Sequence, residues 1–380
     1  MILQSRGSGR RWLVAFSLGS LLSGSAASQS FQVERKDGLT LVRNGAEPAS
    51  VPGAPKRVRL VHELTIGGEN DPDEMMIFAI RTVQVGDGGE IFVLDDKIHQ
   101  VKVYGPDGRY LRTIGKTGQG PGELRSPTQM KMLADGNLCL FDVGNSRVSV
   151  YSPGGACLKE IPLAGWRPVR YLPDSRGFGY GDLLDFQGGV KDVLLKFDPK
   201  LNRIATIATL VMVDHPSEKM IPVEMFRLVY QVDRQDRIVW ASTGAYELNV
   251  VGADGTPVRK ILREYEKRPF SRAERDQRIK ESFAGQAPPP DVEPVFSPHK
   301  PVLYYFLFDD EGRTYVRTFE KDDRGSFFYD VFDGEGRFFA RLALPESELL
   351  WVVKKGKAYT YIEENEAGIP QVRRYALAWE

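Results

Sequence analysis

Two stretches of this chain, Gly89-Glu-Ile-Phe-Val-Leu-Asp95 and Gly136-Asn-Leu-Cys-Leu-Phe-Asp142, match each other position by position. The match continues without a gap, because Val101-Lys-Val-Tyr-Gly-Pro-Asp-Gly108 is followed 47 residues later by Val148-Ser-Val-Tyr-Ser-Pro-Gly-Gly155. A Gly, an Asp, a Tyr and a Pro that recur at one fixed spacing indicate an internal repeat.

Each repeat contains short apolar runs separated by turn residues. Gly and Asp suit turns because they tolerate a left-handed backbone or bond to their own backbone. A four-stranded antiparallel unit that recurs about every 40–50 residues is typical of a β-propeller blade. In the first repeat we expect strands at Ile80–Val85, Ile91–Leu94, Gln100–Tyr104 and Tyr110–Gly115.

The spacing predicts an all-β fold, a six-bladed β-propeller over residues 58–380. Looser copies occupy residues 169–208, 228–262 and 302–344, and residues 351–377 supply only three further strands. We expect Val58–Ile66 to be the missing outer strand and to close the ring, because closure removes an exposed sheet edge. The alternative is a five-bladed ring with a separate terminal hairpin.

Two long segments interrupt the regular spacing of the repeats. Residues 211–225 contain Asp-His-Pro and Ile-Pro, and we expect a long loop there. Residues 263–298 contain Ser271-Arg-Ala-Glu274, a capping box, which predicts a surface helix to about Phe283. Residues 29–57 form an N-terminal extension, in which we expect a small hairpin outside the ring.

The N-terminus has the pattern of an export signal. Arg10 and Arg11 precede the apolar run Trp12–Leu22, which is too short to cross a bilayer, since about 20 residues are needed. We expect a signal peptide over residues 1–28, cleaved near Ala27 or Ser28, and a periplasmic or extracellular protein without stable membrane insertion. Both a general secretory signal and a twin-arginine signal fit this pattern.

The overall composition bears on the partners. The chain has 51 basic and 51 acidic residues, and nucleic-acid binding usually requires a basic excess. We therefore expect no nucleic-acid partner. We also expect a monomer. The two cysteines, Cys139 and Cys157, fall in the second and fourth strands of one blade, about 9.6 Å apart, which is too far for a disulfide.

The second repeat carries a more specific pattern. Gly118-Gln-Gly-Pro-Gly-Glu-Leu124 is followed by Asp142-x-x-Asn145-x-Arg147 and then by Gly155. This pattern resembles the NHL repeat and, more closely, exported six-bladed β-propeller proteins. The resemblance implies a binding face. Such proteins include scaffolds for peptides, proteins, RNA or sugars, and a few lyases and hydrolases, so that fold alone does not define a reaction.

Candidate binding residues come from two places. The innermost strands should present polar side chains to a central channel, and the crossover 115–126 and the turn 142–146 should share the rim that carries the long loops. Gly, Asp and Asn in that crossover and turn also fit purely structural roles, and Arg147 fits an ion pair with a neighbouring blade. The candidates are Arg81, Gln129, Lys131, Arg170, Gln119, Glu123, Asn145 and Arg147.

We therefore expect an exported scaffold that binds a peptide, glycan or protein ligand on the face with the long loops. The alternative is a metal-dependent lyase or hydrolase acting at the central channel, as in relatives that use a set of histidines. The chain has only four histidines, with no spacing that predicts convergence. No metal site and no cofactor are expected.

Overall fold

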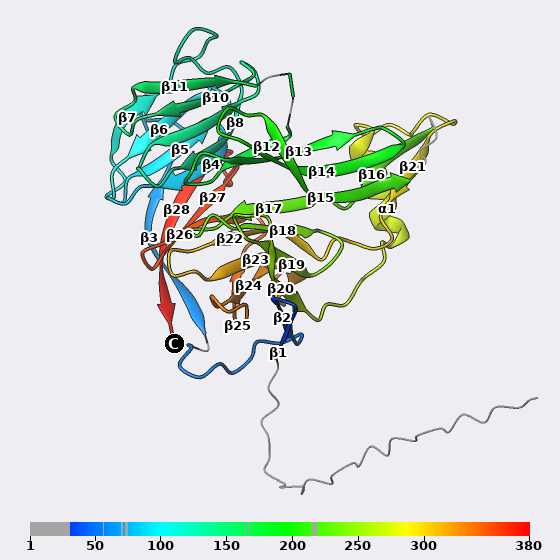
Figure 1. The fold of residues 1–380 in the computed structure, drawn as a ribbon. Helices are drawn as coiled ribbons and strands as arrows, with labels where there is room; N and C mark the ends of the chain where they lie inside the picture. Colours follow the sequence, from blue (N-terminus) through cyan, green and yellow to red (C-terminus); the bar gives the residue numbers. More distant parts are fainter. Residues whose placement is uncertain are drawn as a thin grey trace, which may run out of the picture.

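The computed structural model describes residues 31–55, 57–69, 71–72, 75–163, 165–166, 168–214 and 219–380. The expected signal segment, residues 1–28, lies outside the described residues. Six sheets of at least four strands surround one axis, so the chain is an all-β six-bladed propeller, as the repeat predicts (Figure 1).

Blades one and two are the two matched repeats. The repeated glycines Gly89 and Gly136 have left-handed φ angles of 87° and 82°, which explains why both turns contain glycine. In chain order their strands are β4 (Ile80–Val85), β5 (Ile91–Asp95), β6 (Gln100–Tyr104), β7 (Tyr110–Ile114), β8 (Pro127–Met132), β9 (Leu138–Asp142), β10 (Arg147–Tyr151) and β11 (Cys157–Pro162).

Blades three to five follow the same order, with the first strand of each blade innermost. Their strands are β12 (Arg170–Pro173), β13 (Gly179–Asp185), β14 (Gly189–Phe197), β15 (Arg203–Asp214), β17 (Leu228–Val232), β18 (Ile238–Ser242), β19 (Glu247–Val251), β20 (Pro257–Arg263), β22 (Leu303–Phe308), β23 (Thr314–Lys321), β24 (Phe327–Phe332) and β25 (Phe338–Leu344).

Blade six is built from both ends of the described chain. It contains β26 (Glu348–Lys354), β27 (Lys357–Ile362) and β28 (Gln371–Trp379), and β3 (Val58–Ile66) pairs antiparallel with β28. The prediction that an N-terminal strand closes a six-bladed ring is therefore confirmed.

The segment before the ring is a hairpin of β1 (Phe31–Lys36) and β2 (Leu39–Asn44). It lies outside the ring, as expected, and β2 pairs in parallel with β20, so that the sheet of blade four has six strands. The guanidinium of Arg263 at the end of β20 donates to Ala46 O at 2.6 Å and pairs with Asp330 of blade five at 3.2 Å. This buried contact attaches the extension to two blades.

Most of the described residues of 211–225 belong to strands, and not to the long loop that their sequence predicts. β15 continues to Asp214, because its last residues pair with the first three residues of β14, Gly189 to Lys191. The next strand, β16 (Met220–Glu224), pairs in parallel with β21 (Glu293–Phe296). Pro222 and Pro294 are tolerated in these strands because both strands of a two-stranded sheet are edge strands. The helix α1 (Arg272–Ser282) contacts β16, and its capping box is present as predicted: Ser271 N donates to Glu274 and Glu274 N donates to Ser271.

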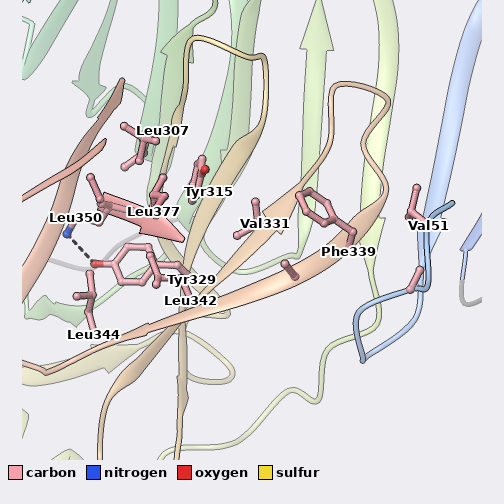
Figure 2. Close-up of a cluster of buried hydrophobic side chains, with 14 residues drawn as sticks. Val51, Leu307, Tyr315, Tyr329, Val331, Phe339, Leu342, Leu344, Leu350 and Leu377 are labelled. Carbon is pink, nitrogen blue, oxygen red and sulfur yellow. Dashed lines mark hydrogen bonds between the residues drawn. The ribbon is translucent and has the colours of Figure 1, made fainter. Parts of the chain in front are cut away.

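Hydrophobic clusters fill the spaces between blades. Between blades five and six, Tyr329, Leu344 and Leu350 lie in one buried cluster that also contains Val51 of the extension (Figure 2). The backbone N–H of Leu350 donates to the Tyr329 hydroxyl at 3.1 Å, which satisfies the only polar atom of that side chain. Close packing between sheets makes the ring a rigid frame for the channel at its centre.

Candidate functional site

A channel runs along the propeller axis. Its volume is about 1340 Å³, and it is lined by the innermost strands of all six blades: β4, β8, β12, β17, β22 and β26. The long connections enter these strands at one end of the channel, which we call the upper mouth. Large, mostly preformed cavities that combine apolar walls with a few polar groups are the usual ligand sites of proteins.

The opposite end, the lower mouth, is held by contacts between the turns of neighbouring blades. Ser175 Oγ donates to Asp236 at 2.6 Å, joining blades three and four. Asp310 of blade five accepts the Lys355 N–H of blade six at 3.0 Å, and Lys354 pairs with Asp87 of blade one at 2.7 Å. These contacts fix the lower rim, so we take the upper mouth as the entrance.

One wall of the channel is aromatic. Five rings from blades five and six form a continuous series, the aromatic arc, in which neighbouring ring centres are 5.4 to 5.9 Å apart. Within the arc, Tyr304 is 50% exposed and the Trp351 indole donates to Thr82 Oγ1 at 2.8 Å. In spatial order the arc is Tyr361, Trp351, Tyr305, Tyr304 and Phe319.

The wall formed by blades three and four is charged. Arg170 pairs with Asp182 at 3.2 Å, and the Tyr230 hydroxyl donates to Asp182 at 2.8 Å. Asp192 is 2% exposed, and its carboxylate accepts the Leu228 N–H at 2.9 Å. Burial, with a smaller effect from the Asp182 charge, raises the pKa of Asp192 to about 6.

Four of the eight candidate binding residues line this channel: Arg81, Gln129, Lys131 and Arg170. Arg81 donates to Thr128 O at 3.2 Å across the boundary between blades one and two. Lys131 forms no hydrogen bond or ion pair with any residue that the structure describes. Burial lowers the pKa of its ammonium group.

The other four candidates lie away from the channel lining: Gln119 and Glu123 in the crossover between blades one and two, and Asn145 and Arg147 in the adjoining turn and on β10. The Asn145 amide donates to Gly118 O at 3.0 Å, and Glu123 accepts the Gly120 N–H at 2.9 Å, which lowers the pKa of Glu123. Gln119 is exposed beside them. These contacts support the structural roles that Gly and Asn predict for this crossover.

Arg147 also holds the crossover. Its guanidinium donates to Gly120 O at 2.8 Å and pairs with Glu160 at 3.2 Å. The expected carboxylate partner therefore exists, but it belongs to β11 of the same blade instead of a neighbouring blade. The two strands are adjacent in the sheet, so the local partner is the nearer one.

The described residues contain no group of three or more His, Cys, Asp or Glu side chains placed to hold a metal ion. His62 lies on the closing strand β3, and His299 Nδ1 contacts Lys300 O at 2.8 Å. His215 lies outside the described residues.

The sequence reasoning missed the aromatic arc and the acidic residues of the charged wall. A signal for the arc exists, because Leu303-Tyr-Tyr-Phe-Leu-Phe308 puts aromatic residues where blade one has Ile80-Arg-Thr-Val-Gln-Val85. Asp182 gave no such signal, because its role depends on the pairing of β12 with β13 and on the adjacent blade.

The ring and its channel define the class of the protein as a six-bladed β-propeller, and the comparisons agree. A family described as a 6-bladed β-propeller matches residues 71–173. The structure is similar to that of a Bacteroides fragilis protein described as exported, with a TM-score of 0.56, 11% identity, and coverage of 90% of this chain and 99% of that chain.

A member of the DUF4221 family from Bacteroides vulgatus is also similar, with a TM-score of 0.52, 10% identity, and coverage of 86% of this chain and 100% of that chain. At such identities the similarity establishes the fold alone. No curated protein matches the chain. In the described part of the chain, no helix has the length and apolarity needed to cross a membrane.

Proposed function

We propose that this chain is an exported binding protein that holds a saccharide in the upper mouth of the propeller channel. The observation that carries the proposal is the aromatic arc, which faces the channel next to a wall of hydrogen-bonding groups. A sugar ring has an apolar C–H face and a rim of hydroxyl groups. An aromatic ring can pack against the face while carboxylates, amides and guanidinium groups bind the hydroxyls.

Two features favour a saccharide over a protein ligand. Tyr304, the most exposed ring of the arc, stands beside the half-buried Trp351 and Phe319 inside the channel, and not on a flat outer surface. A channel of about 1340 Å³ can admit a short oligomer or a loop, but not a folded domain.

Export is supported by the basic and apolar N-terminal pattern that ends near Ser28, and by the similarity to a protein described as exported. Expression of the full chain and of a chain that starts at Gln29, followed by fractionation, tests this part. We expect only the full chain to reach the periplasm or the medium, shortened at its N-terminus. Retention of the full chain in the cytoplasm would refute export.

Binding of the purified protein to a glycan panel tests the saccharide proposal. Tyr304→Ala should weaken binding about 2- to 10-fold, because an aromatic contact contributes about 0.5–1.5 kcal/mol beyond area burial. Leu158→Ala is the matched control, since Leu158 is 55% exposed on the outer strand of blade two. If no saccharide binds, or if both variants bind like the wild type, the proposal is wrong.

A further inference from the structure

We propose that the ligand carries an acidic group, a carboxylate or a sulfate, and that Lys131 binds this group inside the channel while Arg81 and Arg227 attract it at the upper mouth. This inference rests on the proposed function and specifies its ligand as an acidic saccharide. We base the inference on a comparison of the charged side chains of the channel that form ion pairs with those that do not.

Most carboxylates on the channel wall are already neutralised. Asp182 pairs with Arg170, and Asp87 pairs with Lys354. The remaining paired carboxylates have arginine partners, at 2.6 to 3.5 Å: Glu90, Asp174, Glu224, Asp233, Asp236 and Asp309. An ion pair of this kind offers little net charge to a ligand.

Four cations on the wall have no carboxylate within ion-pair distance among the described residues. One of them, Arg234, lies at the lower mouth and donates to Asp310 O at 3.2 Å. Arg81 contacts only the carbonyl of Thr128, and Arg227 contacts the sulfur of Met212 at 3.9 Å apart from its backbone bonds. Lys131 has no hydrogen bond or ion pair in the described part of the chain; the charge of Asp233, which itself pairs with Arg237, acts on it from beyond ion-pair distance. Arg81 and Arg227 are exposed, whereas Lys131 is half-buried.

The positions of Arg81, Arg227 and Lys131 suit one anionic group. Arg81 belongs to blade one and Arg227 leads into blade four, which are opposite blades in a ring of six, so the two guanidinium groups flank the mouth. Lys131 is two residues beyond Gln129 on β8, about 7 Å deeper along the channel. A half-buried ammonium group loses hydration, and an incoming carboxylate or sulfate would offset that cost.

The unpaired acidic groups near the mouth do not favour a cationic ligand. Among the described residues Asp192 forms no ion pair within 4 Å, but the charges of Arg170 and Arg227 act on it; it is 2% exposed, and its oxygen Oδ1 is buried in the wall. Glu363 is exposed at the rim and is the other unpaired carboxylate of the upper mouth among the described residues. The accessible charge there is therefore cationic on balance, and electrostatic complementarity favours an anion.

Matched saccharide pairs test the inference. The probes are trigalacturonic acid with its methyl ester, and a sulfated chondroitin disaccharide with its desulfated form, measured by calorimetry at low salt. In each pair that binds at all, we expect the acidic saccharide to bind at least tenfold more tightly than its methyl-esterified or desulfated form. Lys131→Met should remove most of this difference, and the double variant Arg81→Gln with Arg227→Gln should reduce it. Lys159→Met, which removes an exposed lysine of β11, should leave it unchanged.

A second readout does not depend on the sugar. Sulfate at an ionic strength matched with chloride should raise the melting temperature of the wild type and of Lys159→Met more than that of Lys131→Met. If neutral and acidic partners bind equally, the acidic-group inference is wrong while the saccharide proposal stands. If no saccharide binds but the sulfate difference is present, the saccharide proposal is wrong and the anion site stands. Equal sulfate shifts in all three proteins, with no preference for acids, would refute the anion site.

Discussion

Tyr375 of the last strand lies directly opposite His62 of the strand that closes the ring, and their rings meet edge to face with centres 5.5 Å apart. The two residues are over 300 positions apart in the sequence, so this contact joins the N-terminal and C-terminal parts of the propeller. The stability of the whole ring should depend on the pairing that this contact belongs to.

Removal of the chain through Ile66 should prevent folding. It deletes β3, leaves β28 with an unpaired edge, and opens the ring, at a cost of several kcal/mol against a total stability of about 5–15 kcal/mol. A chain that begins at Gln29 keeps β1 to β3 and should melt cooperatively. Calorimetry and light scattering distinguish the two. A soluble, monomeric and cooperative protein that begins at Gly67 would contradict strand closure.

Arg263→Met should destabilise the protein by about 3–5 kcal/mol, because it leaves the buried Asp330 without one of its two arginine partners. Arg259→Met is the matched control on the same strand, since its partner Glu335 is largely exposed; it should cost at most about 1 kcal/mol. Urea unfolding measures both. Equal costs for the two variants would show that the Arg263 cluster does not anchor the extension.

The free energy of unfolding should depend on pH because Asp192 titrates at a different pH in the folded and unfolded states. Its pKa in the folded state is about 6, above the ordinary value of 3.8, so the folded state binds the proton more tightly than the unfolded state does. The stabilising effect of this proton is complete below pH 4 and is lost as the pH rises through 6. Asp192→Asn removes the titration and should gain stability relative to the wild type over that range, by on the order of 2–3 kcal/mol.

Urea unfolding from pH 4 to pH 8 tests this sign. Asp198→Asn is the control, because hydrogen bonds from Asn202 lower the pKa of the half-buried Asp198, so its titration should be complete above pH 5. A stability difference between wild type and Asp192→Asn that does not change with pH would mean that the Asp192 carboxyl is hydrated in the folded protein.

The two thiols should differ in reactivity. Cys139 is buried in the core, which raises its pKa to about 12, whereas Cys157 is exposed at the start of β11. Titration with a thiol reagent should find one reactive group in the native protein and two after unfolding without reductant. A single group or none in the unfolded protein would contradict the strand order, which places β10 between the two cysteines.

The sequence predicted the ring well because the fold follows from local signals. The spacing of Gly89 and Gly136, and the turn residues after each strand, set both the strand boundaries and the blade count. The extension of β14 and β15 was not predictable in this way. The strand Gly189–Phe197 begins inside the pair Gly188-Gly189, which predicts a turn. The residues opposite its start belong to the segment 211–225, whose prolines predict a loop.

The site was predicted only in part, for a physical reason. Gln129 and Lys131 line the channel together with Met130 and Met132, because β8 is an innermost strand, so these positions follow from the strand order alone. The partners of a charge come from other strands and other blades. Whether Arg147 is held by the crossover, or Lys131 is left unpaired, therefore depends on tertiary contacts that the sequence pattern does not contain.

A crystal structure of the complex with the tightest ligand from the glycan panel is the decisive test of saccharide binding in the channel. We expect a sugar ring against Tyr304 in the upper mouth, with its acidic group within hydrogen-bonding distance of Lys131 Nζ. A ligand bound at the lower mouth, on the outer strands of the blades or on the β1–β2 hairpin, with the channel free of sugar, would contradict it.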